Sequence, residues 1–172
     1  MGYELEKKMK LPYGIIEVDR VYHNRKTGQW CKIPYPNHPK GCPKYGEDDC
    51  PPNTPFITEV LDLRRPTYIA FSEFNLHAHI ETMRSKNPLW SERQLRNVLY
   101  WQNTSRKQMR QRARIARFIR GADIIIECPE GMGVNVYVTC YKSGMPLQRI
   151  RNLTLCRHIA LIGFRKEAKT ND

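Results

Sequence analysis

Apolar and polar residues along the chain follow two periods, and these predict its strands and helices. Strand-like runs, rich in β-branched and aromatic residues, occupy 13–22, 67–71, 124–127, 134–141 and 155–164. Helical patterns occupy 55–65, 76–86 and the stretch that follows Ser91. Because helices alternate with strands, we expect an α/β or α+β fold built on a mixed sheet.

The stretch after Ser91 gives the clearest helix prediction. Ser91 is a suitable N-cap with Gln94 three positions later, and no Gly or Pro follows until Gly121. We expect one long helix here, or two helices broken near Asn103. Apolar residues fall near one face and basic residues recur three or four apart on another, so the helix is amphipathic and strongly basic.

Residues 30–55, here called the proline-rich segment, carry seven prolines in 26 residues, too many for a helix or a central strand. A segment of this length without regular structure is ordered only when something fastens it, and a bound metal is the most economical means. With 172 residues, 40% of them apolar, the chain is long enough for one core. We therefore expect a single metal-binding domain at 13–166, between a charged N-terminal segment, 1–12, and a C-terminal tail, 167–172.

Four of the six cysteines have the setting expected of metal ligands. Cys31, Cys42 and Cys50 lie in the proline-rich segment, Cys128 follows much later, and a proline comes directly after each of them except Cys31. Proline stops the chain from continuing a regular element, so each sulfur can sit at the corner of a loop. Thiolates bind iron and zinc, and four of them complete a [4Fe-4S] cluster or a structural zinc site. We predict all four as ligands and favour the [4Fe-4S] cluster, with zinc as the alternative.

Other uses of the thiols stay open. The spacing lacks the C-x2-C pairs of zinc fingers and bacterial ferredoxins, and His23 or His38 could replace one thiolate in a zinc site. Three disulfides are the alternative to a metal. Cys140 and Cys156 lie in strand-like runs and are expected to be small core residues. If only three cysteines bind a cluster, its remaining iron could act as a Lewis acid.

Charge points to an anionic partner. Lys and Arg number 29 against 17 Asp and Glu, which gives a net charge of +12 and a sequence pI of about 9.6. No apolar run approaches the roughly 20 residues that span a bilayer, and the first residues lack the apolar core of a secretory signal. We expect a cytoplasmic protein with no membrane partner, whose cysteines are thiols or metal ligands.

The positive charge is densest in the predicted long helix. From Arg93 to Arg120 the chain has nine Arg or Lys and no acidic residue, with Tyr100 and Trp101 among them. Cations neutralise phosphates and aromatic rings stack on bases, so this composition is typical of a surface that binds RNA or DNA. The predicted nucleic-acid-binding residues are Tyr100, Trp101, Arg106, Lys107, Arg110, Arg114 and Arg117. The alternative is a solvated helix face with both aromatic rings turned into the core.

Two stretches resemble an uncharacterised family of predicted metal-binding proteins. GCPKYGEDDCPPNTP at 41–55, followed by PTYIAF, is similar to the family's Gly-Cys-x-x-Tyr-Gly and subsequent Cys-Pro-Pro. EGMGVNVYVTCYKSGMPLQ at 130–148 resembles its C-terminal Met-Glu-x-x-Gly-Ile-Asn-Val segment before a Gly-Leu-Pro turn. The resemblance implies a metal or iron-sulfur role for Cys42 and Cys50, with Cys31 as the preceding ligand. Many members have a close-spaced, ferredoxin-like cysteine cluster where this chain has the basic segment YWQNTSRKQMRQRAR, so a second, electron-relay cluster is not implied.

Three functions agree with these features. The first is an iron-sulfur enzyme or accessory protein that acts on a nucleic acid, and the second is a non-catalytic nucleic-acid-binding module folded by zinc. A redox or sulfur-carrier protein is the third. No Ser-His-Asp order or pair of carboxylates identifies a catalytic group, so the sequence leaves enzymatic activity open.

Overall fold

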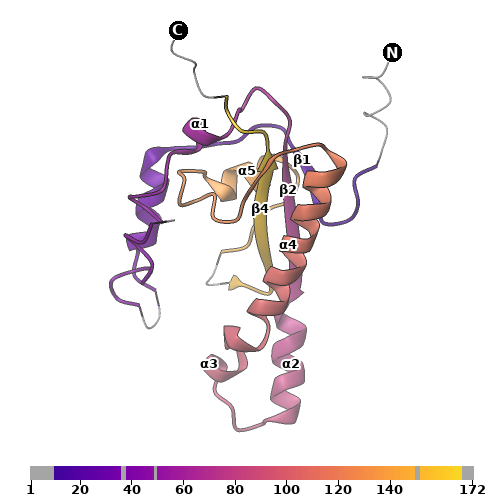
Figure 1. Cartoon of the computed structure of the whole chain (residues 1–172). Coiled ribbons are helices and arrows are strands. Elements are labelled where there is room, and N and C mark those ends of the chain that lie inside the picture. Colours follow the sequence, from indigo (N-terminus) through magenta and orange to yellow (C-terminus); the bar gives the residue numbers. More distant parts are fainter. Residues whose placement is uncertain (1–9, 36–37, 49, 150–151, 168–172) are drawn as a thin grey trace.

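A four-stranded sheet lies at the centre of the molecule (Figure 1). The computed structural model describes residues 10–35, 38–48, 50–149 and 152–167.

The strands of this sheet follow the spatial order β1-β2-β4-β3. They are β1 (Ile15–Val18), β2 (Thr67–Asn75), β3 (Ile124–Ile126) and β4 (Leu155–Gly163). Each overlaps a predicted apolar run, although β1 is shorter than the predicted 13–22 and β2 continues past the predicted 67–71. The α/β class is confirmed. The sheet is antiparallel in every pair of neighbouring strands, not mixed. Alternation of helices and strands predicts the kind of element but does not determine the direction in which neighbouring strands run.

The helix α4 (Gln102–Ile119) covers one face of the sheet (Figure 1). Its buried residues are Ser105, Met109, Ala113 and Ala116, spaced three or four apart as the sequence pattern predicts. They pack on alternate residues of β2 and β4, among them Ala70, Ala160 and Ile162. Small alanines on both sides let the helix lie close to the strands, and the opposite side of α4 faces solvent.

Two short helices, α1 (Ile57–Val60) and α5 (Val136–Lys142), contribute to the core on the other face of the sheet. The prediction of a strand at 134–141 is wrong, because residues 136–142 are helical. The side chain of Asn135 caps the helix by accepting a hydrogen bond from the backbone of Val138 at 3.1 Å. Burial of Val136, Thr139 and Cys140 then follows the helical period and outweighs the strand preference of the β-branched residues.

The helices α2 (Leu76–Lys86) and α3 (Glu92–Leu95), with the 3-10 turn η3 (Val98–Tyr100), form a lobe beyond the end of the sheet (Figure 1). The predicted bounds of α2 are confirmed. The helix expected after Ser91 ends at Leu95 and resumes as α4, so the break comes before Asn103. Asn97 causes a local stop, because its side chain caps η3 by accepting from Leu99 N at 3.1 Å.

Within the described residues, the proline-rich segment has no helix or strand apart from η2 (Arg25–Lys32), a 3-10 helix that overlaps its start, and an isolated bridge between Tyr35 and His38. Asn24 caps η2 and also donates its backbone N–H to the carbonyl oxygen of Gly133 at 2.7 Å. The backbone N–H of Ile57 likewise donates to Met132 O at 2.9 Å. Both ends of the segment are thus fastened to residues 131–134, just after Cys128.

Candidate functional site

Cys31 and Cys42 are brought together by their backbones. The N–H of Cys42 donates to the carbonyl oxygen of Cys31 at 2.7 Å. Gly41 makes this approach possible, because it has φ +83° and a Cβ at that position would run into the Cys31 carbonyl oxygen. The hydrogen bond therefore holds Cys42 beside Cys31, although the two are eleven positions apart in the sequence.

Contacts around Pro51 bring Cys50 toward Cys128. Pro51 is buried, and its ring lies against both Gly28 and Gly131. The backbone N–H of Gly131 donates to the carbonyl oxygen of Cys128 at 3.1 Å, so the turn on which Pro51 packs is the turn that begins at Cys128. Packing in the fold thus joins parts of the chain that are far apart in the sequence.

Electrostatic effects between the thiols agree with their lying near one another. Desolvation raises the pKa of Cys31, and the charges of Cys42, Glu130 and Cys50 raise it further. The pKa of Cys128 is raised to about 11 by desolvation, then by Glu130 and Cys50. The effect of Cys50 on Cys128 joins two distant parts of the chain, whereas the effects on Cys31 come from cysteines of its own segment. We call Cys31, Cys42, Cys50 and Cys128 the cysteine group.

Glu130 is a member of this site that the sequence argument missed. It is half-buried, and desolvation raises the pKa of its carboxyl against the opposing effects of its backbone hydrogen bond and of Arg106. Its charge acts on Cys31, Cys128 and Cys140. The sequence Glu-Cys-Pro-Glu at 127–130 could have indicated it, because a carboxylate two residues from a predicted ligand is well placed to interact with the same site.

Among the described residues, no group of three or more His, Cys, Asp or Glu side chains is arranged to hold a single metal ion. The thiols are neighbours, but they do not surround a common point closely enough for one ion. Cys140 and Cys156 are buried in separate core clusters, as predicted, which removes the alternative of three disulfides. His23 lies 5.4 Å from the ring of Phe56, measured between ring centroids.

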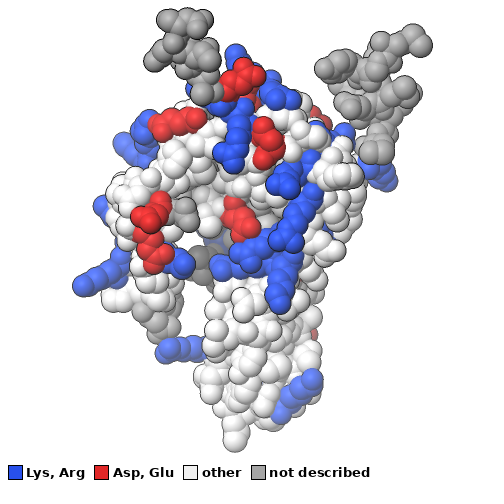
Figure 2. All heavy atoms as spheres, viewed as in Figure 1, with Lys and Arg blue, Asp and Glu red and all other residues white. Residues whose placement is uncertain are grey.

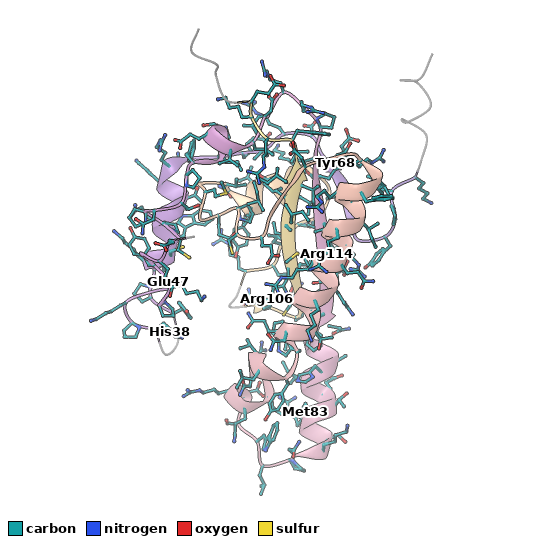
Figure 3. All side chains as sticks on the ribbon, viewed as in Figure 1. His38, Glu47, Tyr68, Met83, Arg106 and Arg114 are labelled. Carbon is teal, nitrogen blue, oxygen red and sulfur yellow. The ribbon has the colours of Figure 1, made fainter. Side chains whose placement is uncertain are left out.

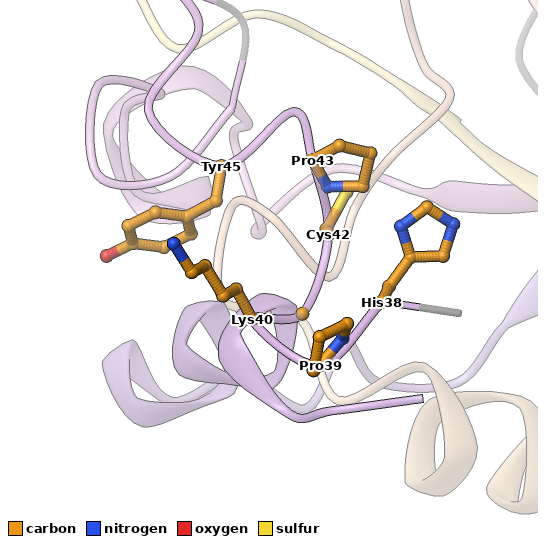
Figure 4. Close-up of a pocket in the computed structure, with 7 residues that line it drawn as sticks. His38, Pro39, Lys40, Cys42, Pro43 and Tyr45 are labelled. Atoms are coloured by element: carbon orange, nitrogen blue, oxygen red, sulfur yellow. The ribbon is translucent and has the colours of Figure 1, made fainter. Parts of the chain in front are cut away.

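A hollow of about 430 Å³ opens beside Cys42 (Figure 4). Its lining comes from the proline-rich segment and consists of His38, Pro39, Lys40, Gly41, Cys42, Pro43 and Tyr45. Lys40 and Tyr45 lie on one side of the chain and His38 on the other, with Cys42 between them (Figure 4). Solvent and small ligands can therefore reach the region of the Cys42 thiol.

The outer side of α4 carries the predicted cations. Arg106, Lys107, Arg110, Arg114 and Arg117 are all exposed, and we call them the α4 basic face. Figure 2 shows Lys and Arg gathered over α4, whereas the lobe of α2 and α3 is largely uncharged on this side. Arg110 pairs with Glu127 at 2.8 Å. In the part of the chain that the structure describes, none of the other four has a carboxylate within salt-bridge distance.

Arg106 connects the α4 basic face with the cysteine group. Its charge lowers the pKa of Cys128 and of Glu130. In Figure 3, Arg106 and Arg114 lie along α4 on the side turned toward the proline-rich segment, where His38 and Glu47 are labelled. One helical turn further along α4, the ion pair between Arg110 and Glu127 likewise connects the helix to the residue that precedes Cys128. A molecule bound on this side of α4 would therefore lie next to Cys128.

The two predicted aromatic residues have different surroundings. Trp101 is 6% exposed and stacks on Phe74 with 4.7 Å between ring centroids and an interplanar angle of 5°. The prediction that Trp101 stacks on bases is wrong, because its ring is already used in the core. Tyr100 is 54% exposed and stacks on Trp90, and its role stays a prediction. α4 itself carries one aromatic residue, Phe118, which is 86% exposed and is not among the predicted nucleic-acid-binding residues.

A row of buried hydrogen bonds lies beneath the start of α4. Ser72 Oγ and Ser105 Oγ are 2.9 Å apart, and Ser105 Oγ is 2.9 Å from His158 Nδ1. Ser72 is fully buried, so its hydroxyl hydrogen is best satisfied by donating to Ser105, which in turn donates to His158. The pKa of His158 is lowered to about 4 by desolvation and then by Arg106, so the imidazole is neutral.

Comparisons with family models, with curated proteins and with solved structures found no match. No helix among the described residues is long and apolar enough to cross a membrane.

Proposed function

We propose that this protein holds an iron-sulfur cluster through Cys31, Cys42, Cys50 and Cys128. The observation that carries the proposal is the approach of the Cys128 turn to the proline-rich segment, made by Pro51 packing on Gly131. Thiols from distant parts of the chain thereby become neighbours, and the charge of Cys50 raises the pKa of Cys128. Such a concentration of thiols is unfavourable for their ionisation unless a cation compensates the charge, and iron supplies that cation.

A cluster suits this arrangement better than zinc. Zinc binds four ligands around one point, and the described residues contain no such group. Each iron of a four-iron cluster takes its own thiolate, so the four sulfurs stand farther apart than around a single ion. When bound, the cluster would supply electron transfer, or Lewis acidity at an iron without a protein ligand. Arg106 would place a positive charge beside it, and Glu130 a carboxyl group.

Nucleic-acid binding by the α4 basic face is the second function that we propose. It is supported by the four cations of this face that lack a carboxylate partner among the described residues. Structural arginines are usually compensated by nearby acids, whereas exposed, uncompensated arginines on one helix attract phosphates. Arg106 would place a bound phosphate chain beside the cysteine group.

Alanine substitutions of the thiols test the cluster. We expect Cys42→Ala and Cys50→Ala to abolish the visible absorption and most of the bound iron, because each removes a ligand. Cys156→Ala is the matched control, since it also removes a thiol, but one buried in the core of the lobe. Loss of iron from Cys156→Ala as large as that from Cys42→Ala would contradict the assignment, and circular dichroism would show whether each variant is folded.

A further inference from the structure

An apolar side chain stands unused at the C-terminal end of α4. Phe118 is 86% exposed, and Ile115, in the preceding turn, is 40% exposed. Phe118 belongs to none of the three core clusters formed by the described residues. A single exposed apolar residue is common on protein surfaces, so its meaning depends on its neighbours.

The neighbours of Phe118 are cations. Arg114 is four residues earlier, hence on the same side of the helix, and Arg117 precedes Phe118 directly. Both arginines are exposed. No acidic residue occurs between Arg93 and Arg120, so charge complementarity favours an anionic partner. An aromatic ring beside phosphate-binding groups is an arrangement that can bind a nucleotide through both its phosphate and its base.

We propose that Phe118 stacks on an unpaired base of a single-stranded nucleic acid whose phosphates are held by Arg114 and Arg117. This rests on the nucleic-acid binding proposed above and narrows the ligand to a single strand. In a duplex the bases are stacked on one another, so a protruding ring has no free face to cover. The stacking role predicted for Trp101 thus passes to a residue that is exposed.

An anionic membrane would also attract this helix, but the structure favours a nucleic acid. A helix that lies in a membrane surface needs a broad apolar face directed outward. On α4 the apolar residues Met109, Ala113 and Ala116 are buried against the sheet. What remains outside is one aromatic ring and one isoleucine among cations.

Binding measurements with the full-length protein test the proposal. The probes are fluorescein-labelled poly(U) and poly(dT), a blunt duplex of the same length, and vesicles of phosphatidylserine and phosphatidylcholine. We expect Phe118→Ala to raise the Kd for the single strands roughly tenfold, since one stacked base is lost. Duplex binding and the salt dependence should change little, and Phe118→Trp should restore the affinity. The control is Leu89→Ala, which removes a side chain that is 98% exposed between α2 and α3, away from α4.

The double variant Arg114→Gln, Arg117→Gln separates this inference from the function on which it rests. If that variant weakens binding and Phe118→Ala does not, the nucleic-acid function stands and the stacking role is refuted. If neither variant changes binding to any strand, the α4 basic face itself is not the interface. If Phe118→Ala weakens binding to the single strands and to the duplex equally, the proposal that the ligand is single-stranded is refuted. Loss of vesicle binding alone would identify a membrane as the partner.

Discussion

His158 shows how a single side chain is controlled by its surroundings. The hydroxyl of Ser105, itself hydrogen-bonded to Ser72, satisfies its Nδ1 inside the protein, and the positive charge of Arg106 disfavours a second proton. The ring is neutral in the folded state, with hydrogen on Nε2 if the hydroxyl hydrogens are arranged as above. Nothing in the sequence around His158 indicates this, because its partners come from β2 and α4.

The lowered pKa of His158 predicts a loss of stability in mild acid. The unfolded chain binds a proton here near the ordinary histidine pKa of about 6.5, whereas the folded protein does so only near its pKa of about 4. Between these values the unfolded state binds more protons, so the free energy of unfolding falls as the pH decreases. Urea unfolding at about pH 7 and about pH 5 measures this fall, which should be smaller in His158→Gln. An equal fall in both proteins would show that His158 is not its source.

Gly41 and Gly46 form a matched pair for testing the backbone contact within the cysteine group. Both have positive φ, +83° and +93°, but a Cβ on Gly41 meets the backbone at Cys31 whereas one on Gly46 meets nothing within 4 Å. We expect Gly46→Ala to cost about 1 kcal/mol of unfolding free energy and Gly41→Ala a further ~2 kcal/mol. Iron content should fall only in Gly41→Ala. Equal effects of the two substitutions would mean that the contact between Cys31 and Cys42 does not matter.

Among the elements, those with one dominant signal could be predicted from the sequence. The helix α2 has its predicted bounds, and each of the four strands overlaps its predicted apolar run. α5 could not be predicted, because its β-branched residues favour a strand and only the Asn135 cap and the buried positions favour a helix. The α4 basic face was predicted from the spacing of its cations. The burial of Trp101 could not be predicted in the same way, because Trp101 follows the short turn η3 and does not continue the pattern of one long helix.

α4 supplies a prediction that concerns charge alone. Replacing Arg106, Arg114 and Arg117 together by Gln should weaken binding to a single strand and reduce the slope of log K against log salt by about 2, because roughly 0.7 counterions are released per phosphate contact. The control replaces Arg20, Lys26 and Lys142 by Gln, which lowers the net charge equally and leaves α4 unchanged; all three are exposed. Fluorescence anisotropy over a range of salt concentrations measures both slopes. The same slope in the two variants would show that only net charge matters.

At the scale of the whole molecule, the site is assembled from separate parts of the chain. Cys31, Cys42 and Cys50 were expected to be close because they share one segment, and Cys128 was selected for its Pro neighbour. That Cys128 lies beside them depends on the packing of Pro51 and on the backbone hydrogen bonds that fasten residues 131–134. The sequence predicts the ligand chemistry, but the contribution of Glu130 and the closeness of Arg106 depend on tertiary structure.

The cluster is tested most directly by anaerobic purification, followed by absorption spectroscopy and iron, sulfide and zinc analysis of one sample. We predict a brown protein with a broad visible absorption band and roughly four iron and four sulfide per chain. One zinc per chain and no colour would support the zinc-folded module instead. A folded protein with neither iron nor zinc, even after anaerobic reconstitution with iron and sulfide, would contradict the account.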